Sequence, residues 1–461
     1  MKDVIGVILA AGEGKRMKSK KSKVVHKILG KAIIEWIYDA ACGAGINENI
    51  VVVGFKADQV KECMGTRVKY AMQEEQLGTG HALMQARNFF EGKEGYLIVL
   101  CGDTPLITSK TIADTIDYHK VNSFSATIVT AEMDDPAQYG RIIRDLNGEV
   151  VKIVEYKDAT EQERSIKEIN SGIYCFNIND LIQTLDKITS NNSQGEYYLT
   201  DAIEIMLSMG LKVGALKIAD SEEILGINDR VQLYEASNVL RKRILQNFMR
   251  EGVTIIDPDT TYIDQGVKIG IDTVIYPGTI IEGNTVVGED CIIGPNSRLI
   301  DATVGNNVEI TASIVAESTI GDDAKIGPFA HLRPQTCVGE HAKVGAFVET
   351  KKCTLGAGTK ASHLAYVGDA EVGRNVNIGC GVVFVNYDGK KKHKTIVGNN
   401  AFVGSNSNLV APVTVGENGY IAAGSTITND VPEYSLAIAR ERQVVKEGWV
   451  IKKDMIRKEK K

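Results

Sequence analysis

The chain has 461 residues, of which 43% are hydrophobic, and it carries a formal net charge of −6 at pH 7. This length allows two or three domains with their own cores, and the negative charge argues against a general nucleic-acid-binding surface. No apolar run could span a bilayer and the eight cysteines form no CxxC pair, so we expect a cytoplasmic protein without membrane insertion, zinc ribbon or disulfide framework.

The first part of the chain alternates buried strands with helical patterns. Nearly continuous apolar runs at Val4–Leu9, Ile50–Val53 and Tyr96–Leu100 are typical of parallel strands covered on both faces, and Ile33–Ala44 has the pattern of an intervening helix. The order predicts an α/β sheet of Rossmann type. Such sheets bind ligands beyond the carboxyl ends of their strands, so the residues after the first and third runs are candidate ligand-binding residues.

A glycine loop follows the first predicted strand, with the sequence AAGEGKRM at residues 10–17. It lacks the third glycine of a dinucleotide fingerprint and the Ser or Thr of a Walker A loop. Its glycines still let backbone N–H groups approach a phosphate, and Lys15, Arg16 and Lys23 supply positive charge. The basic residues favour phosphate binding over a tight turn without a function.

An aspartate, Asp103, follows the third predicted strand beside a glycine turn. One or two carboxylates commonly hold Mg²⁺ against substrate phosphates, so Asp103 is a candidate metal ligand. The alternative is that Asp103 only caps the helix that begins near Ser109. The residues alone do not decide between these two roles.

A long helix is predicted over Asp229–Arg250, because Asp229 can cap it, apolar residues recur at helical spacing and Gly252 can stop it. We place the domain boundary on this helix. The expected organisation is therefore an α/β domain over residues 1–228, a helical linker over 229–252 and a β-helix domain over 253–461. The basic tail over residues 452–461 is expected to be a solvated, frayed terminus.

An aliphatic residue recurs at every sixth position after residue 262, which predicts short strands that turn a corner at regular intervals. In a parallel β-helix, each side of a coil would bury one of these aliphatic residues, and stacked coils would align them in a column. Three sides per coil give about nine coils. The six-residue spacing stops after Leu299 and resumes at Ile320. The repeating positions are Ile263, Ile269, Ile275, Ile281, Val287, Ile293, Leu299, then Ile320, Ile326, Leu332, Val338, Val344, then Val397, Val403, Leu409, Val415, Ile421 and Ile427.

The six-residue spacing shifts between Val344 and Leu355 and is absent from Ile378 to Val397. Regular sequence patterns tend to be interrupted at functional sites, and most candidate functional residues of the predicted β-helix lie in or beside these two stretches. The second stretch contains the basic run 389–394, which is typical of a loop pushed out of the coil. Lys392 in this run could reach a phosphate or could belong to a solvated turn.

Several motifs resemble those of nucleotidyltransferases that couple sugar 1-phosphates to nucleoside triphosphates. They are Leu9-Ala10-Ala11-Gly12-x-Gly14-x-Arg16-Met17, Lys23-Val24, Gln73-x-x-Gln76-x-Gly78-Thr79, Gly102-Asp103-x-Pro105-Leu106, Tyr139-Gly140-Arg141 and Glu168-x-Asn170-x-Gly172. Joined to hexapeptide repeats, they make nearly the whole chain similar to the bacterial bifunctional enzymes that produce UDP-N-acetylglucosamine. The sequence departs from the family pattern at three positions, where Lys15, Ser22 and Cys101 replace the usual Thr, Pro and aromatic residue.

The resemblance implies a uridylyltransferase site in the α/β half. The sugar-phosphate oxygen would attack the α-phosphorus of UTP directly and displace pyrophosphate, with Mg²⁺ shared by Asp103 and Asn228. The residues implied for nucleotide, sugar and metal are Leu9, Ala10, Ala11, Gly12, Arg16, Lys23, Gln73, Gly78, Thr79, Asp103, Gly140, Glu155, Asn170 and Asn228.

The resemblance also implies an acetyltransferase site on the β-helix, with His363 as the general base that takes a proton from the amino sugar. The residues alone favour a structural histidine at a coil corner or an interface, and the matching motif reverses this preference in favour of the base. The implied sugar-phosphate residues are Arg333, Lys351, Tyr366 and Asn377, and the implied acetyl-CoA residues are Cys380, Asn386, Tyr387, Ser405, Ala423 and Arg440. Hexapeptide proteins resembling this one form left-handed β-helices and homotrimers.

Two other functions remain open at this stage. The first is a monofunctional sugar-1-phosphate nucleotidyltransferase whose β-helix is purely structural, although this leaves the motifs around His363 without a purpose. The second is a non-catalytic scaffold that resembles translation-factor exchange subunits of the same domain order. The presence of Lys23, Asp103 and Asn228 argues against the scaffold.

Overall fold

The computed structural model describes residues 3–455, so the end of the basic tail lies outside the described residues. The chain divides into two compact units, Met1–Ile244 and Leu245–Lys461. Within the described range, every helix is too short or too polar to cross a membrane. All eight cysteines are free thiols.

The first unit is built on a nine-stranded sheet with the order β11-β7-β10-β6-β1-β4-β5, to which β8 and β9 attach at β10. β10 runs antiparallel to β6 and β7, whereas the remaining pairs along this order are parallel. The expected α/β sheet is confirmed, with antiparallel pairing at β10 and in the attached β8 and β9 that the apolar runs did not reveal. The strands are β1 (Val4–Ala10), β4 (Glu48–Val53), β5 (Lys69–Met72), β6 (Tyr96–Cys101), β7 (Ala126–Glu132), β8 (Arg141–Arg144), β9 (Val150–Val154), β10 (Glu168–Asn177) and β11 (Val213–Lys217), beside a separate hairpin of β2 (Lys27–Ile28) and β3 (Lys31–Ala32).

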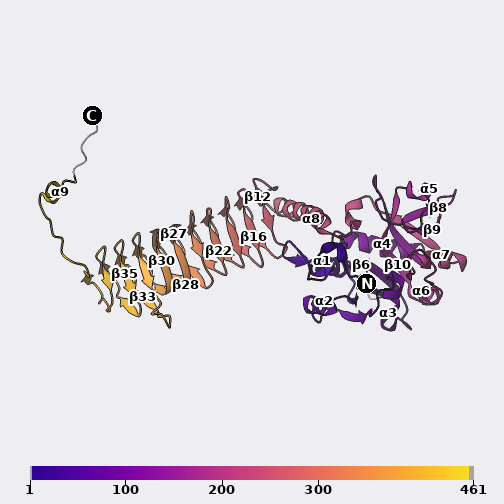
Figure 1. Cartoon of the computed structure of the whole chain (residues 1–461), viewed down its shortest axis with the longest axis horizontal. Coiled ribbons are helices and arrows are strands. Elements are labelled where there is room, and N and C mark those ends of the chain that lie inside the picture. Colours follow the sequence, from indigo (N-terminus) through magenta and orange to yellow (C-terminus); the bar gives the residue numbers. More distant parts are fainter. Residues whose placement is uncertain (1–2, 456–461) are drawn as a thin grey trace, which may run out of the picture. The chain divides into compact units, whose positions relative to one another are not determined.

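Helices cover both faces of this sheet (Figure 1). Alternate residues of each strand point to opposite faces, so Ile8 packs with α1, α2 and α4 in one core while Val7 packs with α3, α6 and α7 in the other. The helices are α1 (Ile33–Gly43), α2 (Ala57–Met64), α3 (Thr79–Gln85), α4 (Ser109–Val121), α5 (Glu161–Arg164), α6 (Ile178–Leu185), α7 (Asp201–Ser208) and α8 (Arg230–Arg250).

The predicted long helix is present as α8. The carboxylate of Asp229 accepts hydrogen bonds from the backbone N–H groups of Val231 at 2.9 Å and Gln232 at 3.0 Å, as expected of a helix cap. Gly252 follows the helix with φ of 97°, a conformation that favours glycine. The division between the two units falls within α8.

The second unit is a left-handed parallel β-helix whose short strands stack in successive coils (Figure 1). Its first side consists of β12 (Thr254–Ile255), β15 (Val274–Ile275), β18 (Ile292–Ile293), β21 (Glu309–Ile310), β24 (Lys325–Ile326), β27 (Lys343–Ala346), β29 (Lys360–His363), β31 (Asn377–Ile378), β34 (Phe402–Val403), β37 (Tyr420–Ile421) and β39 (Leu436–Ala437). Nine of these strands lie between Ile263 and Ile427, as the sequence predicted.

The other two sides share one continuous sheet, because β28 and β30 run across the corner between them. Its strands are β13 (Tyr262–Ile263), β14 (Lys268–Ile269), β16 (Ile280–Glu282), β17 (Val286–Val287), β19 (Arg298–Ile300), β20 (Thr303–Val304), β22 (Ile314–Ala316), β23 (Thr319–Ile320), β25 (His331–Leu332), β26 (Thr336–Val338), β28 (Glu349–Leu355), β30 (Tyr366–Val372), β32 (Val383–Val385), β33 (Thr395–Val397), β35 (Asn408–Val410), β36 (Val413–Val415) and β38 (Thr426–Ile427). A short helix, α9 (Trp449–Lys452), follows the β-helix.

The repeating aliphatic residues are buried inside the coils, except Ile269, which is half-buried. The strict six-residue spacing stops after Leu299, as expected, but the buried column of aliphatic residues does not. Val304, Ile310 and Val315 are buried at spacings of five or six residues, so the column continues with shorter sides. A search for strict hexads misses this continuation because a side of five residues still presents one side chain inward.

The two predicted breaks differ in kind. In the first, Thr350 occupies a buried position and one side shortens by a single residue, so no loop forms there. In the second, Phe384 still continues the column, and the following residues leave the coil. The residues paired there, Val383 and Asn408, are 25 positions apart, whereas Phe402 and Tyr420 in the next coil are 18 apart. The predicted loop is therefore confirmed.

Replacement of Ile293 by Ala tests the contribution of the buried column. Ile293 is fully buried, whereas its neighbour Ile292 on the same strand is 44% exposed. We expect Ile293→Ala to lower the free energy of unfolding of the β-helix by about 2–5 kcal/mol, because a cavity replaces the side chain. Urea titration followed by circular dichroism measures the loss. Ile292→Ala is the matched control, and equal losses in the two variants would contradict the buried column.

Candidate active sites

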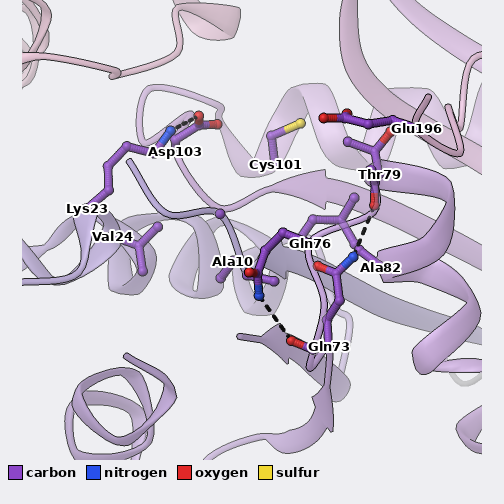
Figure 2. A pocket seen from close by; sticks show the side chains of 14 residues that line it. Ala10, Lys23, Val24, Gln73, Gln76, Thr79, Ala82, Cys101, Asp103 and Glu196 are labelled. Carbon is purple, nitrogen blue, oxygen red and sulfur yellow. Dashed lines mark hydrogen bonds and ion pairs between the residues drawn. The ribbon is translucent and has the colours of Figure 1, made fainter. Parts of the chain in front are cut away.

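A cavity of about 320 Å³ lies beyond the carboxyl ends of β1 and β6 in the first unit (Figure 2). Nine of the residues predicted for nucleotide binding line it together with five others. The predicted lining residues are Leu9, Ala10, Ala11, Gly12, Lys23, Gln73, Gly78, Thr79 and Asp103, and the others are Val24, Gln76, Ala82, Cys101 and Glu196. Residues as far apart in sequence as Leu9 and Glu196, 187 positions, thus line the same cavity.

Lys23, Asp103 and Asn228 meet at this cavity. The ammonium group of Lys23 lies 2.5 Å from Asp103 Oδ2 and 3.2 Å from Asn228 Oδ1, and Figure 2 shows the first of these contacts. The side chains of Lys23 and Asp103 are only 12% and 24% exposed. Two oxygen ligands from distant parts of the chain therefore share one cation.

Asp103 does not cap the following helix, so the structural alternative for this residue is wrong. The cap of α4 is Thr108, whose hydroxyl accepts a hydrogen bond from the backbone N–H of Thr111 at 3.1 Å. The carboxylate of Asp103 is free to face the cavity and its cation instead.

Three hydrogen bonds hold the turn that carries Asn228. The backbone N–H of Gly226 donates to the hydroxyl of Tyr139 at 3.1 Å, that of Ile227 to the carbonyl of Asp103 at 2.8 Å, and that of Asn228 to Gln232 Oε1 at 2.8 Å. Gln232 was not predicted as a site residue. Its signal was the spacing Asp229-x-x-Gln232, in which the Gln side chain reaches back past a helix cap.

The oxygen pair of Asp103 and Asn228 suits Mg²⁺, which takes oxygen ligands and usually needs only one or two carboxylates beside substrate phosphates. The Lys23 ammonium between these oxygens indicates that their arrangement already favours positive charge. Among residues 3–455, there is no cluster of three or more His, Cys, Asp or Glu side chains suited to a metal. A metal at this cavity would therefore complete its coordination with ligand oxygens and water.

The remaining predicted residues of the first unit lie in neighbouring hollows. Arg16 and Asn228 line one of about 450 Å³ with Gln138, Tyr139 and Gln232. Glu155 lines another of about 160 Å³.

Burial raises the pKa of Glu155, and a hydrogen bond from Thr200 Oγ1 at 3.4 Å opposes that rise. Gly140 and Asn170 lie together, because the backbone N–H of Asn170 donates to the Gly140 carbonyl at 2.9 Å.

The three departures from the family pattern have different surroundings. Lys15 is exposed and pairs with Glu13 at 3.0 Å. The backbone N–H of Ser22, which a proline would lack, donates to Gln59 Oε1 at 2.8 Å. Cys101 lines the cavity, and burial raises the pKa of its thiol to about 12, so this group stays neutral at physiological pH.

In the second unit, basic side chains gather beside the extruded loop. The side chain of Lys392 lies next to that of Lys351 and lowers the pKa of Lys351, and Arg333 adds a further positive charge. Acidic groups flank this cluster, since Arg333 Nη1 lies 2.7 Å from Glu349 Oε1 and Lys392 Nζ lies 3.9 Å from Asp369 Oδ2. The sequence did not predict Asp369, and of the two roles open to Lys392 the structure favours the one beside the basic cluster.

The amide of Asn386 ties the base of this loop to the coil. Its Nδ2 donates to Asp369 Oδ2 at 2.5 Å and lies 3.3 Å from the Tyr366 hydroxyl. Asn386 is buried, whereas Tyr387 is exposed and donates to the carbonyl of Gly389 at 2.7 Å. Asn377 is half-buried on β31.

His363, Cys380, Ser405 and Ala423 occupy equivalent places in successive coils. Each precedes a corner residue of positive φ, and backbone hydrogen bonds of about 2.8 Å link the corners along this column. The Arg440 side chain passes beside Gly424, the corner that follows Ala423. Over the described part of the chain, no hydrogen bond or ion pair engages the exposed His363 ring. The ring is therefore open to a ligand that lies along the column.

Comparisons with known proteins cover both units. A family model described as nucleotidyl transferase matches residues 5–222, and one described as bacterial transferase hexapeptide matches residues 266–301, 317–352 and 394–429. The chain is 64% identical over 460 residues to the bifunctional protein GlmU of Acetivibrio thermocellus, covering all of both chains. It is 58% identical to that of Caldanaerobacter subterraneus subsp. tengcongensis, with 98% of each chain covered, and 54% identical to that of Clostridioides difficile, with 97% covered.

Replacement of Gln232 by Met tests the support of Asn228. The variant loses the acceptor for the Asn228 N–H, and one such bond is worth about 0.5–1.5 kcal/mol, so we expect Mn²⁺ to bind about threefold to tenfold more weakly. Mn²⁺ shares the preference of Mg²⁺ for oxygen ligands and its binding can be followed by electron paramagnetic resonance. Gln246→Met, at an exposed position of the same helix, is the control. Equal Mn²⁺ affinities in the two variants would show that Gln232 does not position Asn228.

Proposed function

The chain belongs to the family of bifunctional GlmU proteins, and we propose that it carries out two reactions in separate units. Residues 253–461 transfer acetyl from acetyl-CoA to glucosamine 1-phosphate. Residues 1–228 couple the resulting N-acetylglucosamine 1-phosphate to UTP and release UDP-N-acetylglucosamine and pyrophosphate. Residues 229–252 link the two. The observation that carries the proposal is the full-length identity of 64%, supported by a cluster of suitable chemistry in each unit.

For the uridylyl transfer, the cavity beyond β1 and β6 would hold UTP. The exposed guanidinium of Arg16 and the half-buried ammonium of Lys23 would attract and orient the phosphates, and their charge would stabilise the transition state. Asp103 and Asn228 would hold Mg²⁺, which supplies further positive charge to the phosphate oxygens when bound.

In this reaction, an oxygen of the sugar phosphate forms a bond to the α-phosphorus as the bond from that phosphorus to pyrophosphate breaks. No covalent enzyme intermediate is needed, so positioning accounts for much of the rate. Gly140, Glu155 and Asn170 would hold the sugar beside the nucleotide. Burial raises the pKa of Glu155, and its carboxyl oxygens can accept hydrogen bonds from sugar hydroxyls.

For the acetyl transfer, the column of His363, Cys380, Ser405 and Ala423 would run alongside acetyl-CoA, with Arg440 near its phosphates and Asn386 and Tyr387 beside its acyl end. The amino nitrogen of the sugar forms a bond to the thioester carbon and the C–S bond breaks. His363 takes the proton that the amine loses and returns it to the departing sulfur, so that CoA leaves as the free thiol.

The sugar phosphate of this second site has a suitable anchor in the basic cluster. Arg333 and Lys351 bring positive charge to a phosphate, and the nearby Lys392 supports a third contact. Tyr366 and Asn377 would hold the sugar ring. A purely structural β-helix gives this cluster no purpose, so the monofunctional alternative explains less of the molecule.

Assembly and cellular location follow from the family resemblance. We propose a homotrimer, because the hexapeptide repeats of this unit resemble those of trimeric transferases. Exposed aromatic pairs on the coils, such as Phe329 with Phe347 at 5.4 Å between ring centres, are compatible with such an assembly. The eight free thiols fit a reducing, cytoplasmic location.

Two variants should separate the reactions. His363→Asn removes the base and is expected to slow release of CoA thiol by about 100-fold or more while pyrophosphate release from UTP continues. Asp103→Asn should have the reverse effect, because it removes the carboxylate from the phosphate site. Thiol titration and a coupled pyrophosphate assay measure the two rates on the same preparations. Loss of both activities in either variant would contradict the assignment of one reaction to each unit.

Removal of metal should affect only one reaction. With excess EDTA, we expect pyrophosphate release to stop, because the triphosphate charge is no longer neutralised, while thiol release keeps its rate. Added Mg²⁺ should restore the lost activity. Thiol release that also depends on Mg²⁺, or pyrophosphate release that survives EDTA, would be inconsistent with a metal held by Asp103 and Asn228 alone.

A further inference from the structure

Gln73 is a buried amide whose two ends face different surroundings. Its side chain is only 3% exposed and lines the cavity proposed for UTP (Figure 2). The amide nitrogen lies 3.1 Å from the carbonyl oxygen of Gly78 and 3.0 Å from Nδ1 of His81. A carbonyl oxygen only accepts hydrogen bonds, so the atom facing it must be the nitrogen. Both amide hydrogens are thereby engaged.

The amide oxygen of Gln73 is left to face the cavity. Across the described residues, no protein group donates a hydrogen bond to it, although it belongs to a side chain buried in a cavity wall. A buried acceptor of this kind favours a ligand that brings a donor. The orientation of the amide therefore decides whether the cavity presents an acceptor or a donor at this point.

His81 is the group that completes this orientation. Because the Gln73 nitrogen donates to Nδ1, that ring nitrogen must be the unprotonated one, and the proton of the neutral ring is on Nε2. The amide nitrogen of Gln85 lies 3.0 Å from Nε2 and 3.5 Å from the backbone carbonyl oxygen of His81. Exchanging the two similar ends of that amide gives up the longer contact and lets its oxygen accept the Nε2 proton. The ring thus connects Gln85 to Gln73.

The pyrimidine bases differ at the place where this acceptor would act. Uracil carries an N–H at position 3, which donates to an acceptor. Cytosine has an unprotonated nitrogen there, whose lone pair would face the lone pairs of the Gln73 oxygen. A buried polar group left opposite the wrong partner discriminates strongly between ligands.

We propose that His81 is a positioning residue that fixes the Gln73 amide with its oxygen toward the base, and so selects uracil over cytosine nucleotides. This inference rests on the proposed function, because it concerns the base of the triphosphate bound in the same cavity. Without the acceptor on His81, one amide hydrogen of Gln73 loses its partner. The amide is then held in this orientation only by the Gly78 carbonyl, so turning its nitrogen toward cytosine costs less.

The test compares two replacements of similar size. In His81→Asn, the side-chain oxygen can stand where Nδ1 stands, whereas His81→Leu places a methyl group there. The assay measures kcat/KM for pyrophosphate release with UTP and with CTP at fixed N-acetylglucosamine 1-phosphate. We expect His81→Leu to lower the UTP-to-CTP ratio about tenfold, and His81→Asn to keep it within about threefold of the parent.

A third variant guards against misfolding of His81→Leu. Gln85→Leu removes the acceptor that fixes the ring tautomer while keeping the imidazole, and we expect it to lower the same ratio about threefold. Circular dichroism melting checks that each variant is folded.

The possible results have distinct meanings. An unchanged ratio in both Leu variants, or equal loss in His81→Leu and His81→Asn, would overturn the positioning role while leaving UTP as the substrate. A parent protein that releases no pyrophosphate from UTP would instead overturn the proposed function, and the positioning role with it.

Discussion

Parallel strand pairing is the interaction on which both units depend. Parallel neighbours lie about 4.8 Å apart and end at the same edge, so the residues that follow them come together whatever their separation in sequence. In the first unit, this brings the segment after β1, which carries Lys23, to Asp103 beyond the end of β6, 80 positions away. In the second unit, the same pairing repeats with every coil and aligns His363 with Cys380 at one corner. One rule of strand geometry thus builds two different sites.

The two proposed sites differ in how they keep their positive charge in place. In the first, a half-buried Lys23 is neutralised by Asp103 and steadied by Asn228, so the charge is fixed and partly shielded from water. In the second, Lys351 and Lys392 lie side by side at the surface, and the charge of Lys392 lowers the pKa of Lys351. A phosphate relieves that repulsion on binding, which suits a site that must accept and release a sugar phosphate.

Much of the fold and of the candidate sites could be predicted, because local patterns of residues in the sequence determine them. Buried strands, the α8 helix and the coil column each follow from apolar spacing, and the motif residues around Asp103 lie on one cavity. The shortened coils at Val304 and Val315 were not predicted, because a side of five residues still buries one aliphatic side chain but breaks the six-residue spacing. The spacing Asp229-x-x-Gln232 was a usable signal for Gln232, whereas the role of His81 depends on a side-chain hydrogen bond that spacing alone does not encode.

The central claim is that one chain joins two consecutive reactions. The most direct measurement is to incubate the purified protein with acetyl-CoA labelled in the acetyl carbonyl, glucosamine 1-phosphate, UTP and Mg²⁺, and to separate the products by chromatography. The account predicts that the label appears first in N-acetylglucosamine 1-phosphate and then in UDP-N-acetylglucosamine. Label that stays in acetyl-CoA, or that never passes beyond the sugar phosphate, would contradict it.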